Sequence, residues 1–328
     1  MENSGHGQRA ALYFLFSIFS FLVLGVTRAP GSEQDQEVVA NLSAGRVVIY
    51  VAKDGIVIGS LENRFEAETR PPVVVPLSRR RIGVFLGAVE WVLPGSGRKL
   101  VRLDRELPKL VGEIAGSRRL EPEQASDIEN IGVAVLEPLR AAAQQLHRKI
   151  ELPPEEPLVE LLLAGYAEEY GPEVWLLRYR IVQEPLRGDY WRTRVLRPSY
   201  TQLYPPEKGQ PRTLIEVHYP PGDGGAALLD LLNRNDPRLE RIRTANPRMT
   251  RATERLARGE SHKALLDDAS EFLRAALGAL ALPEARPILA VIQEQRGFEW
   301  LLPPSELPEK AGEAQPHEPS APTLRKKP

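Results

Sequence analysis

Short apolar runs, joined two by two through turns, constrain the fold of this chain more than any other feature. The runs at 47–51 and 56–58 are β-branched, and an Asp-Gly turn lies between them. Such a turn is typical of a β-hairpin, because glycine accepts the positive φ that it needs. A second pair, at 73–75 and 82–86, is also apolar throughout. Strands of this kind are buried on both faces, so we expect a sheet with helices covering it.

Later segments alternate in type and do not repeat at a fixed period. Apolar residues recur every three and four positions where helices are predicted, and Pro138 is expected to kink or split the first of them. Strands, helix, strands, helices and a last strand follow one another, which predicts an α+β fold with a two-sheet core between helical layers. The predicted elements are a helix at 127–150, strands at 158–164, 174–181, 190–196 and 213–219, helices from 226 and at 261–280, and a strand at 287–292.

Composition excludes several classes of function. The 43 Lys and Arg nearly cancel the 44 Asp and Glu, so the chain has no bulk attraction to nucleic acid. It has no cysteine, which excludes disulfides, thiolate metal sites and a cysteine nucleophile. The five histidines are scattered singly, with no two at the spacing that places imidazoles on one helical face. We therefore expect no metal, no cofactor and no nucleic acid.

An uncharged apolar segment at 10–26 is predicted to target the chain for export. Its 17 residues exceed a signal-peptide centre of at most about 15 and just reach the shortest membrane span of about 17, so length alone does not decide between them. Small residues up to Ala29 suit cleavage, whereas Pro30 is expected to hinder it. A cleaved signal peptide within 1–29 and an uncleaved membrane anchor both stay open. Either predicts a periplasmic or extracellular domain, and the arginine-rich, proline-rich composition suggests a bacterial one.

Composition also marks the expected domain boundaries. Residues 30–44 begin with Pro, Gly, Ser and acidic residues, and we expect a linker there. Residues 303–328 are Pro, Glu, Ala and Ser with almost no large apolar side chain, which predicts a disordered tail. One folded domain is therefore expected at 45–302.

Three local patterns in this domain resemble those of one known family. Residues 47–64, reading VVIYVAKDGIVIGSLENR, resemble its opening hairpin, and 161–175 resemble its middle hairpin, with an acidic turn before Gly-Pro. The helix at 261–280, with the strand and hairpin after it, resembles its closing segment. In this order they resemble the proteasome β-type fold of the N-terminal nucleophile hydrolases. The resemblance implies a four-layer αββα sandwich over 45–302.

The same resemblance implies where a nucleophile would lie. Family members use a Thr, Ser or Cys at the start of the first strand, and its own α-amino group acts as the base. That place falls here at Gly45 and Arg46, and neither can attack a carbonyl. The family's lysine has no counterpart in 73–78, and the arginines at 79–81 cannot exchange protons as a lysine does. The resemblance thus implies a non-catalytic domain that acts by assembly or by binding a partner.

One catalytic alternative stays open. Ser43 carries a hydroxyl two residues before the expected place, and cleavage after Leu42 would free its amino group. Glu62 falls near the position of the family's acidic partner. A peptidase or amidohydrolase matured before Ser43 is therefore the competing hypothesis.

The stretch 187–204 interleaves arginines with aromatic residues. Such a mixture suits a protein interface or ligand stacking, and packing of an extended hairpin is the alternative. The implied partner is another protein or a second copy of the chain. If residues 10–26 are not cleaved, they also attach the chain to a membrane. The candidate interface residues are Arg187, Tyr190, Trp191, Arg192, Arg194 and Arg197.

Overall fold

The chain divides into two units, 1–35 and 36–328, and the computed structural model describes residues of the second. The expected export segment at 10–26, and residues 306–328 of the expected tail at 303–328, lie outside the described residues. The described ranges are 39–63, 69–92, 99–102, 128–145, 149–150, 156–167, 171–188, 190–206, 212–221, 228, 236–258, 260, 263–281 and 285–305.

A five-stranded antiparallel sheet contains the first predicted hairpin, in which Ile49 pairs with Ile58. The last predicted strand lies beside this hairpin in the same sheet, although more than two hundred residues separate them. The strands, in spatial order, are β13 (Leu214–Tyr219), β2 (Gly45–Val51), β3 (Ile56–Asn63), β14 (Ala285–Gln293) and β15 (Gly297–Leu302).

The second sheet has eight strands, and all its pairs except β1–β4 are antiparallel. Strand β1 lies within the stretch expected to be a linker. The main path of this sheet is β12 (Ser199–Tyr204), β9 (Gly171–Tyr179), β8 (Val159–Ala167), β6 (Arg81–Val92), β1 (Val39–Ser43) and β4 (Thr69–Arg70), with β5 (Val73–Ser78) and β7 (Lys99–Arg102) also paired to β6.

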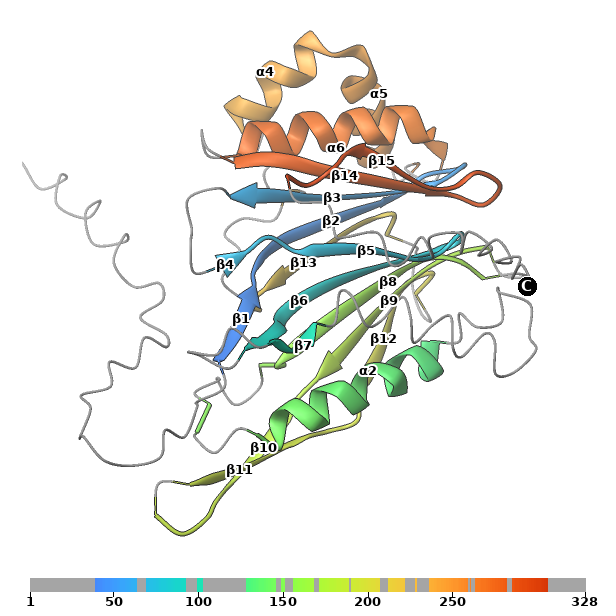
Figure 1. Cartoon of the computed structure of the whole chain (residues 1–328). Helices are drawn as coiled ribbons and strands as arrows, with labels where there is room; N and C mark the ends of the chain where they lie inside the picture. The colour runs from blue at the N-terminus through green and yellow to red at the C-terminus, as the bar shows by residue number, and fades with distance from the viewer. Residues whose placement is uncertain are drawn as a thin grey trace, which may run out of the picture. The chain divides into compact units, whose positions relative to one another are not determined.

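The apolar strands are buried on both faces, as predicted. Their inner side chains, among them Ile49, Ile58 and Leu162, form a core between the two sheets. On the outer face of the five-stranded sheet, α6 (Leu266–Leu280) packs through Phe272 and its neighbours. On the outer face of the other sheet lies α2 (Ile128–Ala143), as Figure 1 shows. Helix α2 continues through Pro138, so the expected split is wrong.

The expected four-layer αββα sandwich of the proteasome type is wrong. Among the described residues, strand outweighs helix by 49% to 26%, and antiparallel sheets dominate rather than helical layers. Helices α4 (Pro237–Ala245) and α5 (Pro247–Ala257) pack on α6. The expectation failed because an apolar strand shows only that both of its faces are buried, and does not show which element covers each face. Here the opposite sheet covers one face, and a single helix covers much of the other.

Strands β9 and β12 continue beyond the eight-stranded sheet as a two-stranded ribbon, formed by β10 (Ile181–Pro185) and β11 (Trp191–Val195). The Leu196 amide donates to the Arg180 carbonyl at 2.9 Å, where the sheet passes into the ribbon. Figure 1 shows the ribbon projecting past the end of the sheet, beside α2. We call β10, β11 and their connecting turn the ribbon from here on.

Asp54, in the turn of the first hairpin, caps the distant helix α6. The Leu266 amide donates to Asp54 Oδ1 at 2.7 Å, which satisfies an N–H group that a helix start otherwise leaves unpaired. Asp54→Ala is therefore expected to lower the free energy of unfolding by about 0.5–2 kcal/mol. Urea unfolding measures this loss. Asp54→Asn keeps the acceptor oxygen and is the matched control, and equal losses in both variants would contradict the capping role.

Candidate functional site

Ser43, the alternative nucleophile, is buried at the end of β1 with 1% of its surface exposed. Its hydroxyl donates to the Pro71 carbonyl at 2.8 Å. Its backbone lies between two strands, paired with Gly87 on one side and Arg70 on the other. Cleavage before Ser43 would separate it from the rest of β1, which holds this register.

Glu62, the proposed acidic partner, is bound elsewhere. Its carboxylate accepts hydrogen bonds from the Arg286 guanidinium and from the Ser305 amide and hydroxyl. Burial acts to raise the pKa of Glu62, but the hydrogen bonds from Arg286 and Ser305 outweigh it and lower that pKa below its usual value. Glu62 thus anchors the chain after β15, and no hydrogen bond joins it to Ser43 in the described part of the chain.

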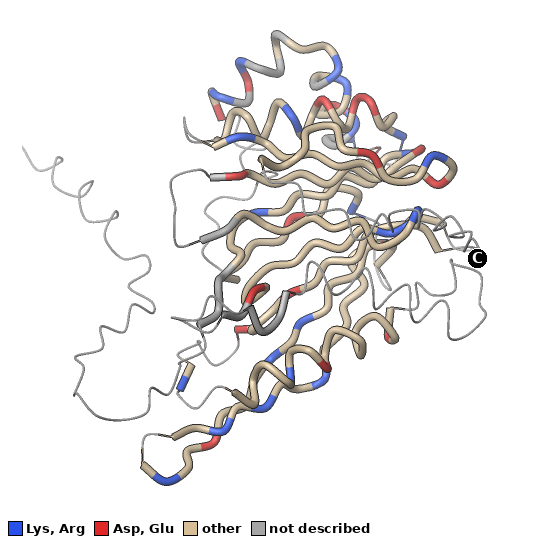
Figure 2. Tube along the Cα trace, viewed as in Figure 1, with Lys and Arg blue, Asp and Glu red and all other residues tan. Residues whose placement is uncertain are grey.

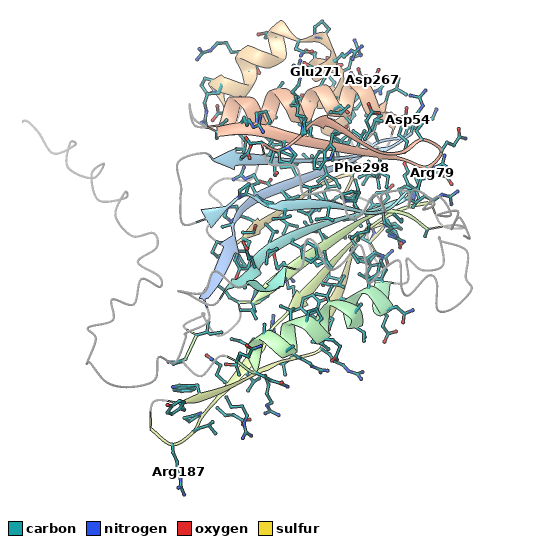
Figure 3. All side chains as sticks on the ribbon, in the orientation of Figure 1. Asp54, Arg79, Arg187, Asp267, Glu271 and Phe298 are labelled. Atoms are coloured by element: carbon teal, nitrogen blue, oxygen red, sulfur yellow. The ribbon has the colours of Figure 1, made fainter. Side chains whose placement is uncertain are left out.

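Gly45 stands where the resemblance implies a nucleophile, and its φ is +126°. This is the region that favours glycine, because a side chain there is strained. The three arginines after β5 do not converge on this place either. Arg79 donates to the Gln295 carbonyl beside the β14–β15 turn (Figure 3), while Arg81 is buried and pairs with Glu173.

Glu160 is the most buried carboxylate between the two sheets, with 1% of its surface exposed. Arg178 donates to its Oε1 at 2.8 Å, and its Oε2 has no hydrogen-bond partner among the described residues. Burial raises the pKa of Glu160, and Arg178 opposes that effect. Structural ion pairs shift pKa values in the same way as active sites do, so this shift alone does not define a catalytic site.

A cavity of about 1,020 Å³ lies between α6 and the β14–β15 hairpin. Figure 3 shows Glu271, Asp267 and Asp54 along this side of α6. Its charges are of both signs and partly satisfy each other, since Arg274 donates to Glu271 at 2.7 Å. That bond from Arg274 is also the main reason why the pKa of Glu271 is lowered. Mixed, internally paired charges do not define one class of ligand.

The ribbon has one face turned inward and one turned outward, because successive residues of a strand point to opposite sides. Thr193 and Val195 are buried on the inner face, and Val195 packs with α2. Trp191 is half-buried on that face, with Lys149 Nζ 5.6 Å from its ring centroid. Val182 and Arg194, paired across the ribbon, are exposed on the outer face.

Exposed apolar side chains gather on and next to this ribbon. The described residues include eight exposed large apolar side chains, and five of them lie between 182 and 200. Tyr190 is 51% exposed and Leu186 is 47% exposed, both at the tip. The five are Val182, Leu186, Tyr190, Leu196 and Tyr200. The sequence-based prediction missed Val182, Leu186 and Leu196. These residues lie two positions from the charged Glu184 or Arg194, and this spacing indicates that they share the solvent-facing side of a strand.

Arginines accompany these apolar groups. Five of the six predicted interface residues are exposed, and only Trp191 is half-buried. Figure 2 shows the basic residues along the ribbon, and Figure 3 shows Arg187 pointing away from its tip. Arg194 pairs with Glu184 on the outer face, whereas Arg187, Arg192 and Arg197 have no ion-pair partner among the described residues. The structure therefore brings most of the predicted interface to one projecting surface.

No protein-family model matches this chain, and the comparison with curated proteins finds no match. The described residues contain no group of three or more His, Asp or Glu suited to a metal ion. None of the helices in the described ranges has the length and apolar character needed to cross a membrane. Function is therefore inferred from the geometry of the surfaces described above.

Proposed function

We propose that this domain is a non-catalytic binding module that docks on a protein partner through the outer face of the ribbon. The observation that carries the proposal is the concentration of exposed apolar side chains and arginines on one projecting ribbon. Aromatic and arginine side chains are enriched at protein interfaces and contribute most of their binding energy. The inner face packs on α2, so the ribbon is held in place before a partner arrives.

Site-specific photo-crosslinking in the producing cells tests this proposal. A photoreactive residue at position 182, exposed on the outer face, is expected to give one discrete crosslinked species. The same residue at 254, exposed on α5, is the matched control and is expected to give none. The species must also disappear when Leu186→Ser and Tyr190→Ser are added. Equal crosslinking at both positions, or none at 182, would overturn the proposal.

The competing peptidase hypothesis makes the opposite claim, and we expect no hydrolysis of peptide amides. Acyl transfer requires an activated nucleophile, yet the Ser43 hydroxyl is engaged by Pro71 and Gly45 has no side chain to attack with. The chain beginning at Ser43 is assayed against a mixed peptide library, with Ser43→Ala as its control. Turnover that disappears in the Ser43→Ala chain would establish the enzyme.

We also propose that residues 10–26 carry this binding domain out of the cytoplasm. A reporter that is active only after export, fused after Trp300, is then expected to be active. The same fusion without residues 1–29 is the control and is expected to be inactive. Activity that does not depend on these residues would remove the export function from the proposal.

A further inference from the structure

Strand β11 has one edge that pairs with no described strand. It pairs with β10 on its other side, and together they form a separate two-stranded sheet. Backbone N–H and C=O groups along an unpaired edge can receive an additional strand from another chain. The edge runs over Trp191–Val195, which is long enough for a short incoming strand.

Two arginines stand at alternate positions on this strand. Arg192 and Arg194 both point to the outer face, where they are exposed. Arg192 has no ion-pair partner among the described residues. Arg194 pairs with Glu184, but both side chains are largely exposed, and such surface pairs are weak enough to exchange partners. The edge therefore presents two guanidinium groups on one side, two residues apart.

The structure holds this edge in an extended form. Thr193 and Val195, between and after the two arginines, are buried on the inner face. The Gln183 side-chain nitrogen donates to the Thr193 hydroxyl at 2.8 Å across the ribbon. The Gln183 side-chain oxygen accepts from the Ile150 amide at 2.8 Å. A strand that is already fixed loses little conformational freedom when a partner binds.

We propose that the partner adds an acidic strand to the free edge of β11, with carboxylates at alternate positions opposite Arg192 and Arg194. This inference rests on the proposed function and names the chemistry of the partner. Opposite charges directly across neighbouring strands stabilise their pairing. Apolar residues of the incoming strand would contact the exposed Tyr190 and Leu196, which flank the two arginines.

A second copy of this chain does not fit the same edge. Two β11 strands paired edge to edge would place the arginines of one copy against those of the other. Like charges across neighbouring strands destabilise their pairing. The same arginines thus prevent self-pairing and select an acidic partner.

A charge exchange tests the proposal on the full chain. The probe is a short fluorescent peptide in which Glu and Val alternate, and binding is followed by anisotropy. Arg192→Glu with Arg194→Glu is expected to weaken binding at least about tenfold, because two favourable pairs become repulsive. The same variant should instead bind the peptide in which Lys replaces Glu. Arg241→Glu with Arg296→Glu changes the net charge equally on exposed residues elsewhere, and should leave binding unchanged.

Two further probes separate strand addition from simple charge attraction. A peptide with N-methyl groups on every amide cannot pair along either edge and should not bind. The inference would be overturned if the methylated peptide bound as tightly as the unmethylated one. It would also be overturned if the acidic peptide bound the Arg192→Glu, Arg194→Glu variant as tightly as the wild type. Tighter arginine-dependent binding of a single-stranded DNA oligonucleotide would overturn it in favour of nucleic acid. Crosslinking at 182 without peptide binding would refute strand addition alone, whereas absence of both would refute the proposed function as well.

Discussion

Phe272→Ala is expected to lower the free energy of unfolding by about 3–5 kcal/mol, the range for removing a large aromatic side chain from a core. Phe272 is fully buried where α6 covers the five-stranded sheet. Its ring meets Tyr50 of β2 edge to face, with the centroids 5.8 Å apart. The substitution would therefore leave a cavity between the helix and the sheet. In urea, the midpoint should fall while the slope of the transition stays the same.

Leu265→Ala is the matched control, since Leu265 stands one residue before α6 and is 49% exposed. The apolar spacing at 265, 269, 272, 276 and 280 predicts that Leu265 lies on the covering face of a helix that begins at 261, and both expectations are wrong. The helix begins at Leu266, which is buried in place of Leu265. The control should cost less than about 1 kcal/mol, as surface substitutions usually do. A similarly small loss for Phe272→Ala would mean that α6 does not cover the sheet.

Local patterns were enough to predict several elements of this fold. The Asp-Gly turn, the β-branched runs beside it and the apolar spacing of α6 each depend on neighbours within a few residues, so they can be read from the chain. The effect of Pro138 could not be read in this way. Buried contacts of Ile131, Val135 and Leu139 stabilise α2 and outweigh the local cost of proline inside it.

The arrangement of the layers could not be predicted, because it depends on pairs that are distant in sequence. Ile56 of β3 pairs with Ile292 of β14, and Val39–Ser43 form a strand beside β6 where a linker was expected. The three hairpin and helix patterns behind the proteasome resemblance are also local. Many antiparallel folds contain such patterns, so they do not determine how helices and sheets are stacked.

The candidate surface was predictable in composition but not in orientation. Arginines and aromatic residues marked the stretch, and most of them are exposed. Which residue faces outward depends on the register of β10 against β11, and that register places Trp191 inside and Val182 outside. The sequence alone does not show that register, and α2 determines which face of the ribbon is covered.

A second large effect is expected at the ion pair of Arg81 and Glu173. The Arg81 side chain, 3% exposed, donates to Glu173, which also accepts from Trp175 Nε1 at 2.7 Å. Burial lowers the pKa of Arg81, and the charge of Glu173 opposes this effect, so the carboxylate stabilises the buried guanidinium. Glu173→Gln removes that charge and is expected to cost about 3–5 kcal/mol, because the buried guanidinium loses the carboxylate that stabilises it.

The double variant Arg81→Met with Glu173→Leu shows whether this loss comes from the broken ion pair or from packing. Apolar residues of similar volume often replace a buried ion pair without loss of stability, since neither charge must then be removed from water. We therefore expect the double variant to unfold at a urea concentration much closer to the wild type than Glu173→Gln does. If its loss equalled the sum of the losses in Arg81→Met and Glu173→Leu alone, the sites would be independent, and the ion pair would not be the source of the effect.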